Sequence, residues 1–341
     1  MNVISLFNGM GTLRQALHDM NIKVNKYYSS EIKPYAIELQ QHHFPEVIQV
    51  GDINNWKEWD IDWKSIDFIG SGSPCQDLSG AGKRAGISGS KSSLFFVFVE
   101  ILEHVKQLNP KVLFLQENVG SALKLDIGIM SRALGIYPAR INSSLVTAQQ
   151  RDRYYWSNIK TKKSMFDNIT DIPQPKDLGI KFKDIIENGY VDNEKSFCLL
   201  EGESRPNNES NQIALKKRLD KSFQSLVWVE KQVKVKTNTK KGFDIVTEND
   251  CLNLSFPKST TRRGRVTKGK SPCLLQGNEP LYCLDNFNLR ILNKTELCRL
   301  QGFPDDYCKI LTRNKAASLL GDGWTLPIVI HFLSFLKEGK K

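Results

Sequence analysis

The first 160 residues alternate short β-branched or apolar runs with longer amphipathic segments. This alternation is typical of βαβ units, in which helices join parallel strands and cover the sheet. Apolar residues recur at helical spacing in two of the longer segments, 13–20 and 92–108. The runs that predict strands are 3–7, 26–31, 47–50, 67–71, 112–117, 139–146 and 154–159. The pattern therefore predicts an α/β fold with a mostly parallel sheet.

The pattern changes after residue 160. A polar stretch with prolines at 161–179 is typical of a linker, and a lysine-rich region with short alternating runs follows it. From residue 286 onward, apolar-faced segments again suit helices or strands that return to the first core. We therefore predict a first domain at 1–174, a second domain at 175–285 and a return segment at 286–341 that completes the first domain.

Charge and cysteine usage narrow the class of protein. The 341-residue chain has 48 Lys and Arg against 37 Asp and Glu, a formal net charge of +11 that favours a polyanionic partner but also serves solubility. Its seven cysteines include no C-x-x-C pair, which argues against a zinc site or a disulfide framework. No apolar stretch approaches the length of a membrane span. We expect no metal, no membrane partner and a reducing, cytoplasmic location.

Three strand ends near the N-terminus carry residues suited to a nucleoside-containing cofactor. Gly9 and Gly11 follow the first strand, where the backbone can approach a ligand closely. Glu31 ends the next strand, where a carboxylate can accept hydrogen bonds from both ribose hydroxyls. Asp52 and Ile53 close the third strand with an acceptor beside an apolar contact. Structural turns and helix caps are the alternatives, and the third glycine of a dinucleotide-binding pattern is missing.

Cys75 follows the fourth predicted strand, directly after Pro74. A thiol on a turn behind a rigid proline is presented to a ligand, whereas a structural cysteine usually lies inside an apolar strand or helix. The glycine-rich loop that follows contains Lys83 and Arg84, which suits a basic lid over an anionic substrate. A phosphate-binding loop is excluded because the glycine spacing fails and Arg84 replaces the hydroxyl residue that magnesium needs.

Two further segments place charged groups near the same edge of the sheet. Glu117 ends a strongly apolar strand, where it suits a proton donor to a ring nitrogen, with a turn-capping carboxylate as the alternative. Arg151 and Arg153 alternate as the chain enters the last predicted strand. One of them can therefore face the site while the other braces the framework.

These segments occur in a recognisable order. FNGMG, Glu31, GDI, GSPCQDLS, ENV and QQRDR resemble the ordered motifs of the DNA cytosine-5 methyltransferases, and NLRILNKTELCRLQGFP and LLGDGWTLPIVIHFL resemble the last two blocks of that family. The resemblance covers 1–160 and 286–335. Two features, the GDGWTLP block and the absence of a glycine after Gly11, make the sequence similar to the catalytic domain of the animal de novo enzymes. The loop SGAGKRAG is instead similar to the corresponding loop of bacterial enzymes. Because no reader domain precedes the first motif, we expect a stand-alone bacterial or bacteriophage member.

The resemblance implies a fold and a reaction. The fold is Rossmann-like and typical of S-adenosylmethionine-dependent methyltransferases, with a mixed, mostly parallel sheet and a smaller, mainly β or irregular target-recognition domain. The reaction is methyl transfer from S-adenosylmethionine to carbon 5 of cytosine in double-stranded DNA, with S-adenosylhomocysteine as product. Cys75 would add to carbon 6 of a flipped-out cytosine, with Glu117, Arg153 and Arg151 as the other catalytic residues.

The resemblance also implies the binding residues. Those expected around the cofactor are Phe7, Gly9, Gly11, Thr12, Glu31, Ile32, Asp52, Ile53, Pro74 and Trp324. Those expected to contact DNA are Gln76, Ser79, Lys83, Arg84, Arg262, Arg263 and Arg265. The three last arginines belong to a basic, hydroxyl-rich run at 258–270 that suits phosphate and base contacts, with a solvated loop as the alternative. We expect a monomer on DNA, with oligomerisation open by the likeness to the de novo enzymes.

Two other interpretations stay open. A close branch of the family modifies transfer RNA with the same cysteine chemistry, although the large basic region between QQRDR and NLRILN favours duplex DNA. An inactive DNA-binding regulator is disfavoured because Cys75, Glu117 and Arg153 are all present. The sequence predicts neither the DNA target nor an accompanying restriction nuclease.

Overall fold

The computed structural model describes most of the first domain and of the return segment. The described residues are 1–74, 93–165, 167–189, 191, 193–199, 226–228, 233–236, 240–246, 251–253, 266–267, 281–283 and 289–338.

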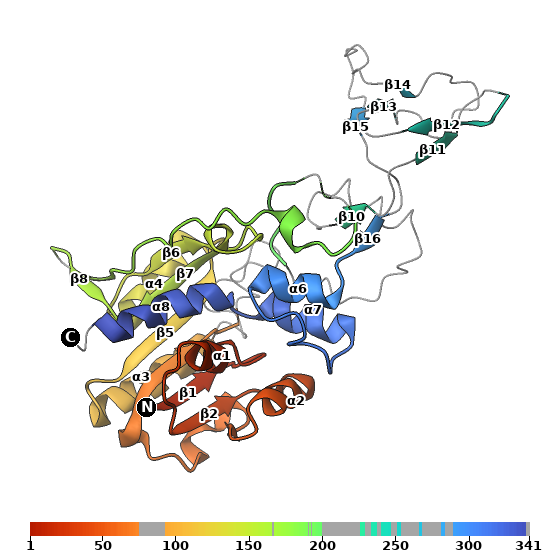
Figure 1. Ribbon diagram of the computed structural model, residues 1–341. Helices are drawn as coiled ribbons and strands as arrows, with labels where there is room; N and C mark the ends of the chain where they lie inside the picture. The colour runs from red at the N-terminus through yellow and green to blue at the C-terminus, as the bar shows by residue number, and fades with distance from the viewer. Residues whose placement is uncertain are drawn as a thin grey trace.

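A seven-stranded sheet in the order β3-β2-β1-β4-β5-β7-β6 forms the centre of the molecule (Figure 1). Neighbouring strands are parallel except at β7, which is antiparallel to both β5 and β6. The strands are β1 (Asn2–Leu6), β2 (Lys26–Ser30), β3 (Ile48–Gln49), β4 (Ile66–Ser71), β5 (Leu113–Val119), β6 (Ala139–Asn142) and β7 (Asp152–Ser157). All seven predicted strands and the mostly parallel sheet are thereby confirmed.

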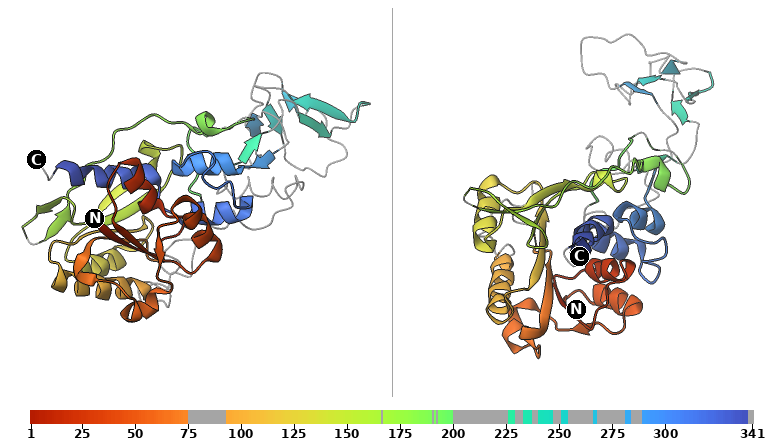
Figure 2. Two further views of the ribbon diagram at one scale, coloured as in Figure 1. Left: turned by 60° about the horizontal axis from the view of Figure 1, so that its bottom comes forward. Right: turned by 60° about the vertical axis from the view of Figure 1, so that its left-hand side comes forward.

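Helices cover both faces of this sheet (Figure 2). The apolar residues of the first face form one buried cluster and those of the second face form another. The first face carries α1 (Thr12–Asp19), α2 (Pro34–His43), α6 (Lys294–Gln301), α7 (Arg313–Asp322) and α8 (Leu326–Glu338). The second carries α3 (Leu94–Leu108) and α4 (Lys124–Leu134). The two helices predicted from apolar spacing are confirmed as α1 and α3.

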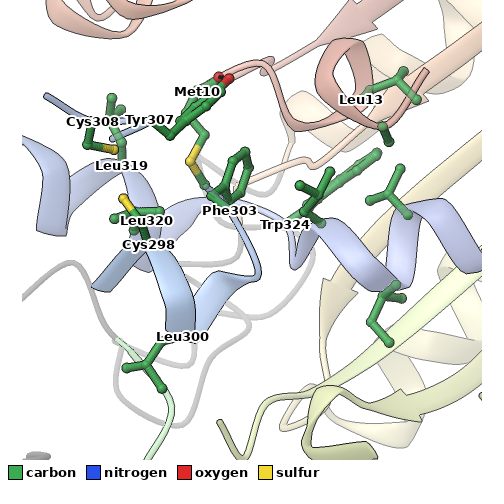
Figure 3. Packing of buried hydrophobic residues seen from close by; sticks show 14 of the residues in the cluster. Met10, Leu13, Cys298, Leu300, Phe303, Tyr307, Cys308, Leu319, Leu320 and Trp324 are labelled. Carbon is green, nitrogen blue, oxygen red and sulfur yellow. Dashed lines mark hydrogen bonds between the residues drawn. The ribbon is translucent and has the colours of Figure 1, made fainter. Parts of the chain in front are cut away.

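The return segment completes the first core, as its apolar faces predicted. α8 packs along α1, and the ring of Phe332 lies 5.0 Å from that of Tyr155 on β7. The Tyr307 hydroxyl donates a 2.8 Å hydrogen bond to the carbonyl oxygen of Met10. Figure 3 shows Met10 packed beside Phe303 and Tyr307, so residues almost 300 positions apart in the chain form one layer.

Two segments differ from the sequence prediction. The predicted linker contains a hairpin of β8 (Thr161–Lys163) and β9 (Asn168–Thr170). The Thr170 hydroxyl accepts a hydrogen bond from the Ser157 amide and donates one to its carbonyl, which ties the hairpin to β7. The strand predicted to reach residue 146 ends at Asn142, because the Asn142 side chain accepts from the amides of Ser144 and Arg151 and begins a 3-10 helix.

The chain between 175 and 199 also packs on the first core. Phe182, Ile185 and Leu199 lie in the same buried cluster as α6 and α8. The Lys195 ammonium donates to three backbone carbonyls, those of Ser144, Thr147 and Ile180. This clamp holds 180–195 against the loop after β6, and the predicted domain boundaries at 174 and 285 stay predictions.

Short strands make up the described part of the second region beyond residue 199. β10 (Leu226–Trp228) pairs with β16 (Leu289–Ile291), so the two ends of the region lie side by side. The others are β11 (Val233–Lys236), β12 (Phe243–Val246), β13 (Cys251–Asn253), β14 (Val266–Thr267) and β15 (Leu281–Cys283), which lie apart from the large sheet in Figure 1. The described residues of this region fit the predicted mainly β or irregular character, and the second domain itself stays a prediction. No single helix of the described chain is long and apolar enough to span a membrane, and only α7 and α8, bent by 44°, pass as a pair.

Candidate active site

The turn after β1 has an unusual backbone. Phe7, Gly9 and Gly11 have φ angles of 55°, 57° and 82°, in the region that residues with side chains rarely adopt. The buried Asn8 side chain accepts a hydrogen bond from the Tyr27 hydroxyl at 3.0 Å. Its Nδ2 atom is buried without a hydrogen-bond partner among the described residues. The turn therefore presents backbone and a spare buried donor at the carboxyl end of β1.

Glu31 joins this turn to the next strand end. Its Oε2 atom accepts a 2.7 Å hydrogen bond from the Gly9 amide, and its Oε1 atom accepts from the amides of Ile32 and Lys33. Both of these amides precede Pro34, the first residue of α2, so the carboxylate closes a turn before the helix and does not cap the helix itself. Each carboxylate oxygen can accept two hydrogen bonds, so Oε2 keeps acceptor capacity for a hydroxyl. The Ile32 side chain beside it is 68% exposed.

Asp52 lies at the end of the neighbouring strand. Its Oδ1 atom accepts 2.9 Å hydrogen bonds from both the amide and the side chain of Asn54, which caps the 3-10 helix Ile53–Glu58. The Ser30 hydroxyl donates to the Gly51 carbonyl and so holds the ends of β2 and β3 together. The Ile53 side chain is buried in the core of the second face, so it supports the strand end from below.

Trp324 covers the end of β4 from the return segment. Its ring lies so close to the sheet that a β-carbon on Gly72 would be 2.6 Å from its Nε1 atom. At the neighbouring Gly70, a β-carbon would be 2.5 Å from the Leu13 side chain. Only glycine fits at such approaches. The indole, labelled in Figure 3, is 9% exposed, and Pro74, two residues after Gly72, is half-buried. Thr12, also predicted near the cofactor, is buried at the first residue of α1.

Glu117 and Arg153 form an ion pair on the two central antiparallel strands. The Arg153 Nε atom lies 2.8 Å from Glu117 Oε1, and the two side chains are 12% and 10% exposed. The register places Val119 opposite Arg153 and Tyr155 opposite Glu117, so the pair spans a diagonal between β5 and β7. The Arg153 Nη1 atom also donates to the Asp152 carbonyl. The sequence proposed both residues for one site, and the structure brings them into contact.

Arg151 is buried and binds backbone instead. Its Nη1 atom donates to the Leu199 carbonyl at 3.1 Å, and its Nη2 atom donates to the carbonyls of Gly321 and Gly323 at 3.1 and 2.9 Å. The guanidinium therefore links the beginning of the second region to the residues just before Trp324.

Cys198 is a site residue that the sequence analysis missed. Its sulfur accepts hydrogen bonds from Arg151 Nη1 at 3.4 Å and from Arg153 Nη2 at 3.8 Å. Burial raises the pKa of the Cys198 thiol, but the two guanidinium charges outweigh it and leave the pKa below its ordinary value. No local motif marks this cysteine, because its arginine partners lie more than 40 residues earlier in the chain.

Several predicted residues cannot be placed. Those outside the described part of the chain are Cys75, Gln76, Ser79, Lys83, Arg84, Arg262, Arg263 and Arg265. Within the described part, no group of three or more His, Cys, Asp or Glu residues could hold a metal ion.

Comparisons with known proteins identify the family of the chain. A family model described as C-5 cytosine-specific DNA methylase matches residues 1–333. The type II methyltransferase M.NlaIV of Neisseria lactamica is 24% identical over 96% of both chains. The type II methyltransferase M1.ScrFI of Lactococcus lactis subsp. cremoris is 26% identical over 99% of this chain and 79% of its own.

A phage protein and a solved structure complete the comparison. The orphan methyltransferase M.SPRI of Bacillus phage SPR is 31% identical over 55% of this chain and 43% of its own. The S. pombe Dnmt2 methyltransferase has a TM-score of 0.56 at 15% identity, over 100% of this chain and 99% of that one. At this identity the structural likeness shows the fold, and the predicted Rossmann-like methyltransferase fold is confirmed.

Proposed function

Because the chain belongs to the C-5 cytosine-specific DNA methylases, which transfer a methyl group from S-adenosylmethionine to carbon 5 of cytosine, we propose that it modifies double-stranded DNA through a covalent Cys75 adduct. The observation that carries the proposal is the buried Glu117–Arg153 pair at the edge of the sheet where β4 leads to Pro74. Cys75 follows Pro74 by one peptide bond, which limits the distance between their Cα atoms to about 3.8 Å.

The residues at the strand ends suit the cofactor. Glu31 keeps acceptor capacity for a ribose hydroxyl, and Asn8 has a buried amide hydrogen without a partner among the described residues. Phe7, Ile32 and Trp324 supply apolar or aromatic surface, and the backbone at Gly9 allows a close approach. When bound there, S-adenosylmethionine supplies an electrophilic methyl group on a sulfonium.

Cys75 begins the chemistry. Its thiolate adds to carbon 6 of cytosine, and the electron pair of the carbon 5–carbon 6 double bond makes carbon 5 nucleophilic. After carbon 5 has gained the methyl group and lost its proton, the carbon–sulfur bond breaks and the thiolate leaves.

Glu117 and Arg153 hold the base during this addition. In this proposal Glu117 acts as the proton donor to the ring nitrogen at position 3, and the Arg153 guanidinium donates to the carbonyl oxygen at position 2. The two side chains are in contact, so both can reach one small planar ligand. Arg151 supports the site by fixing the backbone beside Cys198 and just before Trp324.

Duplex DNA requires further contacts. A stacked cytosine hides carbon 6, so the base must flip out at a cost of about a few kcal/mol, which phosphate contacts offset. We assign these contacts to Gln76, Ser79, Lys83, Arg84 and to Arg262, Arg263 and Arg265 of the recognition region. The protein acts as a monomer on DNA in this proposal.

Bisulfite sequencing of plasmid DNA from cells that express the protein tests the proposal, with Cys75→Ser as the matched control. Protected cytosines in one sequence context, absent with Cys75→Ser, are the expected result. Glu117→Gln should slow methyl transfer by a factor of about 100 or more, because the amide cannot protonate the ring nitrogen. Equal protection with the Cys75 variant would refute the covalent mechanism, and methyl transfer to transfer RNA alone would refute the DNA substrate.

A further inference from the structure

Side-chain hydrogen bonds, and not backbone pairing with a neighbouring strand, hold the segment that follows β4. β4 pairs with β1 and with β5 only as far as Ser71, where Leu6 and Gln116 are its partners. Residues 72–74 continue without strand pairing, and Pro74 is the last described residue before Cys75. The segment that leads to the proposed nucleophile therefore needs another anchor.

Ser73 supplies that anchor. Its buried hydroxyl oxygen accepts a 2.9 Å hydrogen bond from Gln116 Nε2 and a 3.3 Å hydrogen bond from Asn118 Nδ2. Both amides come from β5 and are also buried, so the cost of losing these hydrogen bonds is not recovered from water. Two donors from one strand thus converge on a single oxygen two residues before Cys75.

Gln116 also contacts the backbone of Glu117. The same Nε2 group donates a 2.8 Å hydrogen bond to the carbonyl oxygen of Glu117. One amide therefore connects Ser73, two residues before the nucleophile, with the backbone of the residue that pairs with Arg153. Successive residues of a strand point to opposite faces, so Gln116 and Asn118 can form this anchor while Glu117 faces the base.

We propose that Ser73 and Gln116 are positioning residues that set the distance between Cys75 and Glu117. This inference rests on the proposed function and assigns to the pair a role in catalysis without contact to the substrate. A displacement of about 1 Å in a reacting group can cost a factor of about 100 in rate, so loss of this anchor should affect turnover more than ligand binding.

Ser73→Ala tests the proposal, with Ser71→Ala as the matched control. Ser71 lies two residues earlier, at the end of β4, is also buried, and its hydroxyl has no hydrogen-bond partner among the described residues. We expect Ser73→Ala to lower kcat for methyl transfer to plasmid DNA about 10- to 100-fold and to leave the Kd for S-adenosylhomocysteine within about twofold. Ser71→Ala should retain the kcat of the wild type.

A second variant and a second measurement keep the test decisive. Gln116→Met preserves the size of the side chain but removes its hydrogen-bond donor, so it should reproduce the loss of kcat. If Ser73→Ala does not fold, Gln116→Met alone tests the proposal. Hydrogen exchange of the peptide around Ser73, measured without substrate, should be several-fold faster in both variants than in Ser71→Ala. If the wild type is active and both variants keep its kcat or its exchange rate, this proposal alone is overturned. If the wild type itself shows no methyl transfer, the proposed function is overturned and this role with it.

Discussion

Replacing Gly72 by alanine probes how the return segment closes over the sheet. The added β-carbon would lie 2.6 Å from Nε1, 3.3 Å from Cε2 and 3.6 Å from Cδ1 of Trp324. A β-carbon essentially never approaches a heavy atom below 3.0 Å, and the obstacle here is a rigid, buried ring. The indole must therefore move, and overpacking of this kind typically costs about 1–3 kcal/mol of the free energy of unfolding.

The assay combines two measurements on Gly72→Ala. Urea denaturation should show the loss of about 1–3 kcal/mol, and calorimetric titration should show weaker binding of S-adenosylhomocysteine because Trp324 is displaced from the pocket. Gly128→Ala in α4 is the control, since its nearest atom would be the flexible end of Arg132 at 3.7 Å. Alanine inside a helix should stabilise that variant by about 0.5–1 kcal/mol.

Two results would refute this reasoning. Unchanged stability of Gly72→Ala would mean that Trp324 does not lie against β4 as described. Lower stability with unchanged affinity would keep the packing but remove Trp324 from the proposed cofactor pocket.

Three other predictions follow from single groups. Lys195→Met should lower the free energy of unfolding in urea by about 1–3 kcal/mol, because three backbone carbonyls lose a charged donor, and an unchanged value would exclude the clamp. The pKa of Cys198 is lower in the folded chain than in the unfolded one. The stability of the wild type relative to Cys198→Ala should therefore be greatest above about pH 8.5, and this advantage should be lost as the pH falls through the folded pKa. A stability difference between the two proteins that stays constant from about pH 6 to pH 9.5 would contradict this. Replacing Arg262, Arg263 and Arg265 with glutamine should weaken DNA binding and reduce the slope of log affinity against log salt by about 3, and an unchanged slope would place the phosphate contacts elsewhere.

The sheet could be predicted from sequence because its strands are buried on both faces. Such strands appear as short, nearly continuous apolar runs, and 112–117 is an example that the structure finds as β5. Their ends were harder to predict where a side chain redirects the backbone. Asn142 stops β6 by accepting two amide hydrogens, one of them from Arg151, and that partner lies nine residues later.

The candidate site was predictable where its residues follow strand ends. Glu31 was found this way, and Glu117 lies near the carboxyl end of β5, which continues two residues further to Val119 than the sequence predicted. The hydrogen bond from the Gly9 amide to Glu31 and the contacts of Cys198 depend on packing between distant segments. Apolar periodicity contains no information about such contacts, which explains why Cys198 was missed.

The place of Trp324 against Gly72 has a consequence for synthesis of the protein. A ribosome reaches Trp324 roughly 250 residues after it has made the end of β4, which at about 5–20 residues per second means a delay on the order of 10–50 s. Once residue 153 has been made, the nascent chain contains the motifs from Phe7 to Arg153 but lacks the ring that covers the strand end. A product that stops before residue 324 therefore contains Cys75 but lacks Trp324, so under the proposed mechanism unfinished chains should not transfer a methyl group.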